Sequence, residues 1–180
     1  MERRTFKLNS WILFALFSIS GLFISNAAKA QGPERQHIYA SEGLYFNTIG
    51  KDECVIEGNV SIGYKFNNLS LFVPVSLSER LYGINTTKNF DIQGLIGGGV
   101  SELLGISDKS KLEFVLTGQS TLLNKGADYK YSTARFDIKH VARQKVGYRT
   151  IGIGIQYYKM YDGSLGKDGL HPCISIGFLL

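Results

Sequence analysis

Apolar and polar residues alternate with a period of two along most of the chain from residue 36 onward. This period places successive side chains on opposite faces of an extended strand, and helical spacing of apolar residues is hard to find. A weaker segment with the same pattern spans 43–47, where Leu44 and Phe46 fall on the apolar face. The clear segments are 59–66, 69–78, 90–100, 111–117, 134–139, 151–158 and 174–180.

The connections between these segments are typical of an antiparallel barrel. Asn67-Asn68 predicts a tight turn, because Asn tolerates positive φ, and a second short turn is expected near Val146-Gly147. Longer connections are expected at 48–54, 80–88, 123–129 and 162–172. The sequence therefore predicts an all-β fold, an up-and-down antiparallel β-barrel of about eight strands.

Two positions are less regular. Leu103, Leu104 and Ile106 lie in a stretch, 101–109, that we interpret as a loop or a helical turn. Pro74 lies inside a predicted strand, yet a closed barrel has no edge to hold a residue that lacks a backbone N–H. Pro74 is therefore a signal against a closed barrel, unless a bulge at this position absorbs it.

The composition of the polar face indicates which face is inside. A soluble barrel normally turns a face rich in Lys and Glu to water, whereas small residues and charges of both signs suit the cramped interior of a closed barrel. The apolar face would then contact lipid, with Tyr and Phe near the strand ends. We therefore predict a transmembrane barrel that is plugged by polar side chains rather than an open pore. The small members of the polar face are Ser61, Gly63, Ser70, Ser76, Gly97, Thr117, Thr121, Thr133, Gly152, Gly154, Ser175 and Gly177, and its charged members are Lys65, Asp91, Glu113, Arg135, Asp137 and Lys139.

The first thirty residues have the three-part layout of a cleavable secretory signal peptide. A basic start is followed by a mostly apolar run over 11–24, and Ala28-Lys29-Ala30 supplies small residues for cleavage. The run is shorter than the roughly 20 apolar residues of a membrane-spanning helix. We therefore expect a signal peptide at 1–30, a short polar arm at 31–35 and a single barrel domain at 36–180.

Composition and charge narrow the function classes. The 180 residues are 44% hydrophobic and 19% charged, which excludes an intrinsically disordered chain. The formal net charge of +5 comes mostly from the signal peptide, since residues 1–30 hold four of the 20 basic residues and one of the 15 acidic ones. The remainder carries +2, so a nucleic-acid partner is not expected.

With its signal peptide, about eight alternating strands and an apolar C-terminal strand, the sequence resembles the small outer-membrane β-barrel proteins of Gram-negative bacteria. The resemblance covers nearly all of the chain after residue 30 and points to no particular family. It implies a location in the cell outer membrane, contact with outer-membrane lipid, and a barrel too narrow for an open pore. Two alternatives remain: a soluble periplasmic or secreted barrel that binds a small apolar ligand as lipocalins do, and a lipid-modifying outer-membrane enzyme.

Cys54 and Cys173 are the two cysteines. In an oxidising compartment an even pair usually forms a disulfide, and both residues fall near the same rim of the predicted barrel. Strict alternation, however, places Cys54 on the apolar face and Cys173 on the polar face. We predict a disulfide, with two free thiols as the alternative.

The charged residues of the polar face admit two interpretations. Glu113, Arg135, Asp137 and Lys139 lie on neighbouring strands, and they would form a mutually paired interior network that offsets the cost of removing them from water. A proton or ion relay is the alternative. We favour the paired network, because the side chains of a barrel this small fill its interior.

The outer loops hold the remaining candidates. Tyr82, Ile84, Leu165 and His171 are the candidates for contact with an extracellular partner, because they lie where the loops meet solvent. Ordinary packing of these loops over the barrel mouth is the alternative, and we favour it. For the enzyme alternative, His171 with Ser164 or Asp168 is the set in the right loop, although nothing orders it into a triad. We assign no catalytic residue, no metal site and no cofactor. The glycine-rich segments match no phosphate-binding spacing, so a nucleotide is not expected.

Overall fold

The computed structural model describes residues 37–48, 54–81, 90–107, 109–122, 130–145, 147–161 and 168–180. All regular secondary structure in these residues is β. None of the described residues forms a helix of the length and apolarity needed to cross a membrane. The strands are β1 (Ile38–Thr48), β2 (Cys54–Phe66), β3 (Leu69–Leu81), β4 (Phe90–Ser107), β5 (Ser110–Thr121), β6 (Tyr131–Arg143), β7 (Tyr148–Met160) and β8 (Gly169–Leu179).

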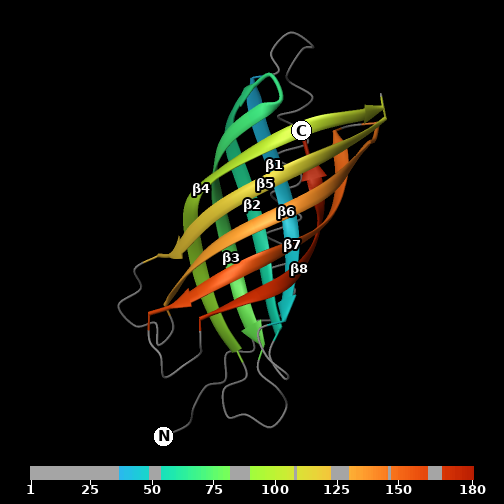
Figure 1. The fold of residues 1–180 in the computed structure, drawn as a ribbon. Helices are drawn as coiled ribbons and strands as arrows, with labels where there is room; N and C mark the ends of the chain where they lie inside the picture. Colours follow the sequence, from blue (N-terminus) through green and yellow to red (C-terminus); the bar gives the residue numbers. More distant parts are fainter. Residues whose placement is uncertain are drawn as a thin grey trace, which may run out of the picture.

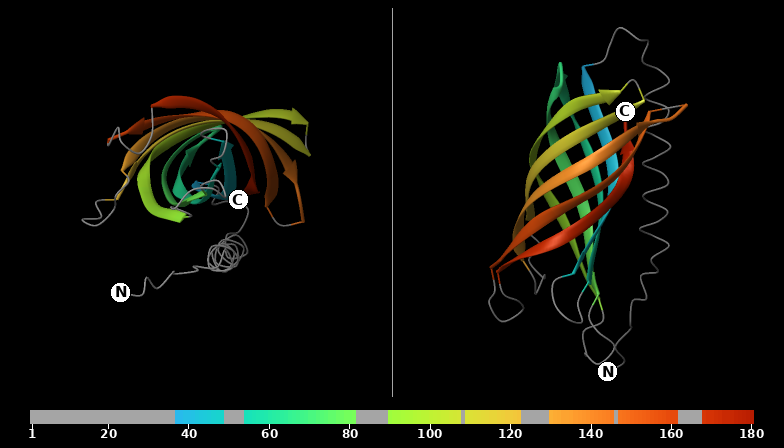
Figure 2. Two further views of the ribbon diagram at one scale, coloured as in Figure 1. Left: turned by 90° about the horizontal axis from the view of Figure 1, so that it is seen from below. Right: turned by 45° about the vertical axis from the view of Figure 1, so that its right-hand side comes forward.

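The eight strands form one closed barrel in which each strand pairs with its neighbour in the chain (Figure 1). Every pairing is antiparallel, and β1 closes the barrel by pairing with β8, from Ser41 opposite Leu179 to Asn47 opposite Cys173. The strands run obliquely around the barrel (Figure 2). The predicted up-and-down barrel is confirmed.

Three short connections lie at the same end of the barrel as the C-terminus, and we call this the turn end. Asn67 has a φ of 56° in the turn between β2 and β3, as the Asn pair predicts. Between β6 and β7, Gly147 has a φ of 67° and its carbonyl accepts a hydrogen bond of 3.0 Å from the Gln144 N–H. A side chain at Gly147 would be strained. The opposite end, which we call the loop end, receives the connections 49–53, 82–89, 123–129 and 162–167.

The prediction of a loop or helical turn at 101–109 is wrong. β4 is 18 residues long and continues to Ser107, which pairs with Ser110 after a register shift near Gly105. Ser101 and Leu103 point inward and are buried, while Leu104 and Ile106 are exposed on the outside. The adjacent pair Leu103-Leu104 obscured the period in the sequence. Pairing with β5 satisfies the backbone of this stretch and makes it a strand.

The closed barrel accommodates Pro74 without a bulge. Pro74 lies opposite Ser61 on β2, and the ladder between β3 and β4 passes from Phe72–Gly99 to Val75–Ile96 without a register shift. Pairing is interrupted for two residues on each strand instead. Gly97 and Gly98 occupy the interrupted stretch of β4, so the proline ring faces residues without side chains.

The barrel is polar inside and apolar outside. Inward positions are mostly Ser, Thr, Asn, Gln and charged residues, and they are buried. Outward positions carry large apolar side chains that are exposed, among them Ile153 at 68%. Two apolar clusters lie inside near the ends: Tyr39, Phe72, Leu103, Val115, Val141 and Leu179 toward the turn end, and Leu95, Tyr131, Tyr158 and Met160 toward the loop end. A polar layer separates these two apolar clusters.

Gly99 is expected to be sensitive to substitution because it holds space for the turn-end cluster. A Cβ at Gly99 would overlap the Phe72 ring, which stacks on Tyr39 with ring centres 4.7 Å apart. Gly99→Ala should therefore lower the free energy of unfolding in urea by about 1–3 kcal/mol. Gly98→Ala is the matched control, because nothing lies within 4 Å of a Cβ there. An equal loss for both variants would contradict this account of the packing.

Candidate functional site

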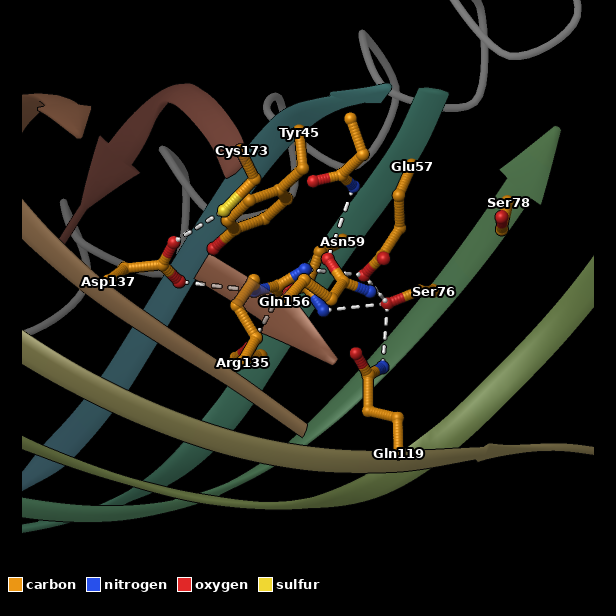
Figure 3. A network of polar contacts seen from close by, with 12 residues as sticks. Tyr45, Glu57, Asn59, Ser76, Ser78, Gln119, Arg135, Asp137, Gln156 and Cys173 are labelled. Atoms are coloured by element: carbon orange, nitrogen blue, oxygen red, sulfur yellow. Dashed lines mark hydrogen bonds and ion pairs between the residues drawn. The ribbon is translucent and has the colours of Figure 1, made fainter. Parts of the chain in front are cut away.

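The polar layer of the interior is organised around Arg135 on β6. Its Nη1 lies 3.1 Å from Glu57 Oε1 on β2, and its Nε donates a hydrogen bond of 3.1 Å to Asp137 Oδ2 (Figure 3). The three side chains are 1%, 1% and 0% exposed. The guanidinium carbon also lies 3.5 Å from the centre of the Tyr45 ring on β1. One cation on β6 therefore contacts side chains of β1 and β2, which lie far from it in the sequence.

Ser76 on β3 carries the network from Glu57 to the neighbouring strands. Its hydroxyl donates to Glu57 Oε1 at 2.8 Å, and it accepts hydrogen bonds from Asn59 Nδ2 at 2.8 Å and from Gln119 Nε2 at 2.7 Å. Ser61 donates to the other end of the Asn59 amide at 2.8 Å. Figure 3 shows Asn59 and Gln119 converging on Ser76 from two sides. Strands β2, β3 and β5 are thus tied together inside the barrel.

A second group of contacts continues toward the turn end. Lys139 donates to the Tyr45 hydroxyl at 2.9 Å, and the Tyr39 hydroxyl donates to Glu113 Oε1 at 3.0 Å. Lys139 and Glu113 are also direct cross-strand partners on β6 and β5. The Tyr45 ring therefore lies between the two buried cations, with its face on Arg135 and its hydroxyl on Lys139.

Toward the loop end, Asn47 on β1 donates hydrogen bonds of 3.1 Å to Gln156 Oε1 and to the Tyr158 hydroxyl on β7. This contact bridges β1 and β7 across β8. The polar layer fills the middle of the lumen with side chains, and one apolar cluster lies between this layer and each end of the barrel. The arrangement is chemically suited to hold strands together by charge-assisted hydrogen bonds.

The structure brings four of the six predicted network residues into the interior. Glu113, Arg135, Asp137 and Lys139 are buried there, with Arg135 and Asp137 in direct contact. Lys65 is only partly buried, near the turn end. The side chain of Asp91 lies outside the described residues.

Sequence reasoning missed Glu57 and Tyr45, the two residues that contact Arg135 from other strands. The alternation that we read from residue 59 extends two residues further back, which places Glu57 on the inward face with Asn59 and Ser61. That parity could have identified Glu57. No local pattern could have identified Tyr45 as the contact of both cations, because it lies on a strand 90 residues earlier.

The predicted disulfide is not formed, and both cysteines are free thiols. Cys173 points inward and donates a hydrogen bond of 3.3 Å to Asp137 Oδ1, whereas Cys54 begins β2 on the outward face. β1 separates their strands, so their Cα atoms are about 10 Å apart. Disulfides join Cα atoms about 4.4–6.8 Å apart. The intervening strand and the opposite facing of the two side chains together keep the thiols apart.

The loop candidates are placed only in part. Tyr82, Ile84, Ser164 and Leu165 lie outside the described residues. His171 is on β8 rather than in a loop, and its ring meets the edge of Tyr158 at 5.7 Å.

Asp168 does not orient His171 in the described structure. Its carboxylate accepts hydrogen bonds from the Met160 N–H at 2.8 Å and from the Tyr157 hydroxyl at 3.4 Å. Both contacts join Asp168 to the end of β7. The set proposed for catalysis is therefore not assembled among the residues that the structure describes.

A serine–histidine contact occurs instead at the turn end. Ser110 Oγ lies 2.7 Å from His140 Nε2 on the outer surface, where β5 and β6 pair. The hydrogen bonds of the described residues include no carboxylate partner for His140. The described residues also contain no group of three or more His, Cys, Asp or Glu side chains that could hold a metal ion.

No protein-family model matches the chain, and no curated protein matches it either. Its function is therefore inferred from the structure.

Removing the central cation is expected to be costly. Arg135→Met would leave the Glu57 and Asp137 carboxylates buried without their partner, so the free energy of unfolding should fall by about 3–5 kcal/mol. The triple variant Arg135→Met, Glu57→Gln, Asp137→Asn removes all three charges and should recover most of that loss. Unfolding in urea measures both. A triple variant no more stable than the single one would contradict the ion-paired account of the interior.

Proposed function

We propose that this protein is an integral outer-membrane β-barrel with a structural or surface-interaction role and a closed interior. The observation that carries the proposal is the inverted polarity of the barrel. Its buried interior is polar, and its exposed wall is covered by large apolar side chains. In water such a wall would be a very large apolar patch, whereas in a bilayer it meets hydrocarbon.

The dimensions of the wall support this proposal. A tilted strand needs about 9–11 residues to cross a bilayer, and the strands here are 11–18 residues long. Exposed aromatic side chains lie near both ends of the wall. They are Tyr64, Phe66 and Phe178 toward the turn end, and Phe46, Tyr157 and Tyr161 toward the loop end, while Phe136 lies between them on β6. Aromatic residues of membrane barrels gather at these two interfaces.

The orientation follows from the lengths of the connections. Outer-membrane barrels have short periplasmic turns and longer outer loops. The turn end therefore faces the periplasm, and the loop end faces the medium. The signal peptide proposed at 1–30 supplies the route of export. A partner would be met by the loops that carry Tyr82, Ile84 and Leu165.

The interior supports a closed barrel. Arg135, Lys139 and three carboxylates are held by contacts across the lumen, and an apolar cluster lies toward each end. A conducting pore needs a polar path from end to end, and these clusters interrupt it. The same contacts argue for the paired network over a proton or ion relay.

The two alternatives have less support. A lipocalin-like barrel needs an apolar cavity, but the inward positions here are polar and packed against one another. An enzyme needs an ordered set of reacting groups. The serine–histidine contact at Ser110 and His140 has no carboxylate partner among the described hydrogen bonds. A non-enzymatic role is therefore the better proposal.

The proposal is tested by membrane extraction and gel mobility. The protein should remain in the pellet after a carbonate wash of isolated membranes. Without boiling it should migrate as a compact band, and boiling should shift its mobility. A protein that is released by carbonate and shows no heat-dependent shift would overturn the membrane proposal and favour a soluble barrel.

A charge placed on the outer wall gives a second test. Ile153 is near the middle of β7, so Ile153→Arg should lower the stability of the barrel in lipid vesicles by about 2–4 kcal/mol. Leu170→Arg is the control, because Leu170 is similarly exposed, at 63%, but lies near the loop end of β8, where the cost is about 0–1 kcal/mol. Urea titration of the vesicle-inserted protein measures both. Equal effects would contradict a bilayer centred on Ile153.

A further inference from the structure

A groove lies on the outer wall of the barrel at the turn end. Its volume is about 690 Å³. Three apolar side chains line one part of it, Leu44 on β1 with Ile176 and Phe178 on β8. Gln144, Lys145 and Arg149, from the β6–β7 turn and the start of β7, line the other part. The groove thus joins an apolar surface to two cations.

The strand register sets the order of these groups along the barrel axis. Leu44 lies opposite Ile176 within the apolar wall. Phe178, two residues nearer the turn end, lies opposite Arg149. Lys145 follows in the turn itself. The cations therefore lie at the edge of the apolar wall, where a bilayer would place its phosphate groups.

We propose that this groove binds one anionic phospholipid of the membrane leaflet that faces the turn end. The phosphate contacts Arg149 and Lys145, and an acyl chain lies against Leu44, Ile176 and Phe178. Arg149 offers the planar fork that pairs with two phosphate oxygens, and Lys145 adds a point charge. This inference rests on the proposed membrane location, because a lipid reaches the groove from a bilayer.

Charge complementarity is the reason for choosing an anionic lipid. Lys145 and Arg149 are both exposed and bring two positive charges to the groove. A zwitterionic lipid cancels its phosphate with its own cation, so the two groove cations gain little from it. Two carboxylates lie near the groove. One is the C-terminal carboxylate of Leu180, which follows β8 and packs beside Gly147 of the β6–β7 turn. The other is Glu42, opposite Phe178 on β1, whose side chain is buried.

The surroundings of the groove add to the attraction. Lys109, Lys111 and Arg143 also lie at the turn end. Among the described residues, Glu102 on β4 is the exposed carboxylate side chain at this end, besides the C-terminal carboxylate of Leu180. A basic residue near an anionic membrane surface contributes about 1 kcal/mol, which corresponds to about fivefold in affinity.

The test is a lipid titration of the barrel lacking residues 1–30, purified in a neutral detergent and followed by native mass spectrometry. Dioleoylphosphatidylglycerol is the anionic probe, and dioleoylphosphatidylcholine, with the same acyl chains, is the neutral one. We expect one phosphatidylglycerol to bind in preference to phosphatidylcholine. Lys145→Gln and Arg149→Gln should each weaken this binding about fivefold, and the double variant about 30-fold.

The matched control removes the same charge from the other end of the barrel. Lys130→Gln with Lys159→Gln lies near the loop end of β6 and β7, and it should change phosphatidylglycerol binding by less than about twofold. Equal binding of the two lipids would overturn the inference. So would unchanged binding in the groove double variant, or an equal loss in the control.

The membrane extraction assay separates this inference from the proposed function. If the groove variants and the parent chain all resist carbonate and shift on heating, yet phosphatidylglycerol shows no preference for the parent, only the lipid site is wrong. If the parent chain is released by carbonate, the membrane proposal fails and the lipid site fails with it.

Discussion

The contacts of the buried Arg135 guanidinium are the interaction on which the rest of the barrel depends. Two carboxylates and an aromatic ring surround it, from strands β1, β2 and β6. A charge in a closed interior is tolerated only when it is paired and hydrogen-bonded, because removing it from water costs several kcal/mol. Ser76 donates a further hydrogen bond to Glu57, and Asn59 and Gln119 donate to Ser76 in turn. The interior is therefore a connected structure rather than a collection of separate polar side chains.

This polar interior has a direct consequence for the outer wall. Period-two alternation means that each inward polar residue is followed by an outward one, and the outward residues here are large and apolar. A barrel that holds its charges inside must then present its apolar side chains to its surroundings. The membrane proposal grows out of this constraint, since a bilayer is the environment that such a wall fits. The same alternation therefore sets both the polar lumen and the apolar wall.

The two ends of the barrel are built differently, and this asymmetry bears on function. The turn end has short connections, exposed cations and the groove beside Arg149. The loop end receives the four longer connections, where contacts with a partner would be made. This combination suits a surface-interaction role without chemistry.

The sequence by itself determined the barrel, its strand number and the face on which most residues lie. These properties are local, because the backbone of one strand sends neighbouring side chains to opposite faces. The tight turns at Asn67 and Gly147 were also predictable locally, because Asn and Gly tolerate positive φ. Parity also placed Cys54 and Cys173 on opposite faces, although compartment and position near one rim argued for a disulfide.

Only the tertiary structure decided which inward residues meet. Arg135 contacts Glu57, 78 residues earlier in the chain, and Tyr45 on another strand. These contacts depend on the tilt and stagger of the closed barrel, which alternation along one strand does not encode. The same holds for the groove, where Leu44 and Arg149 become neighbours through β8. The course of β4 past Leu103 and the interrupted ladder at Pro74 likewise depend on the strands beside them.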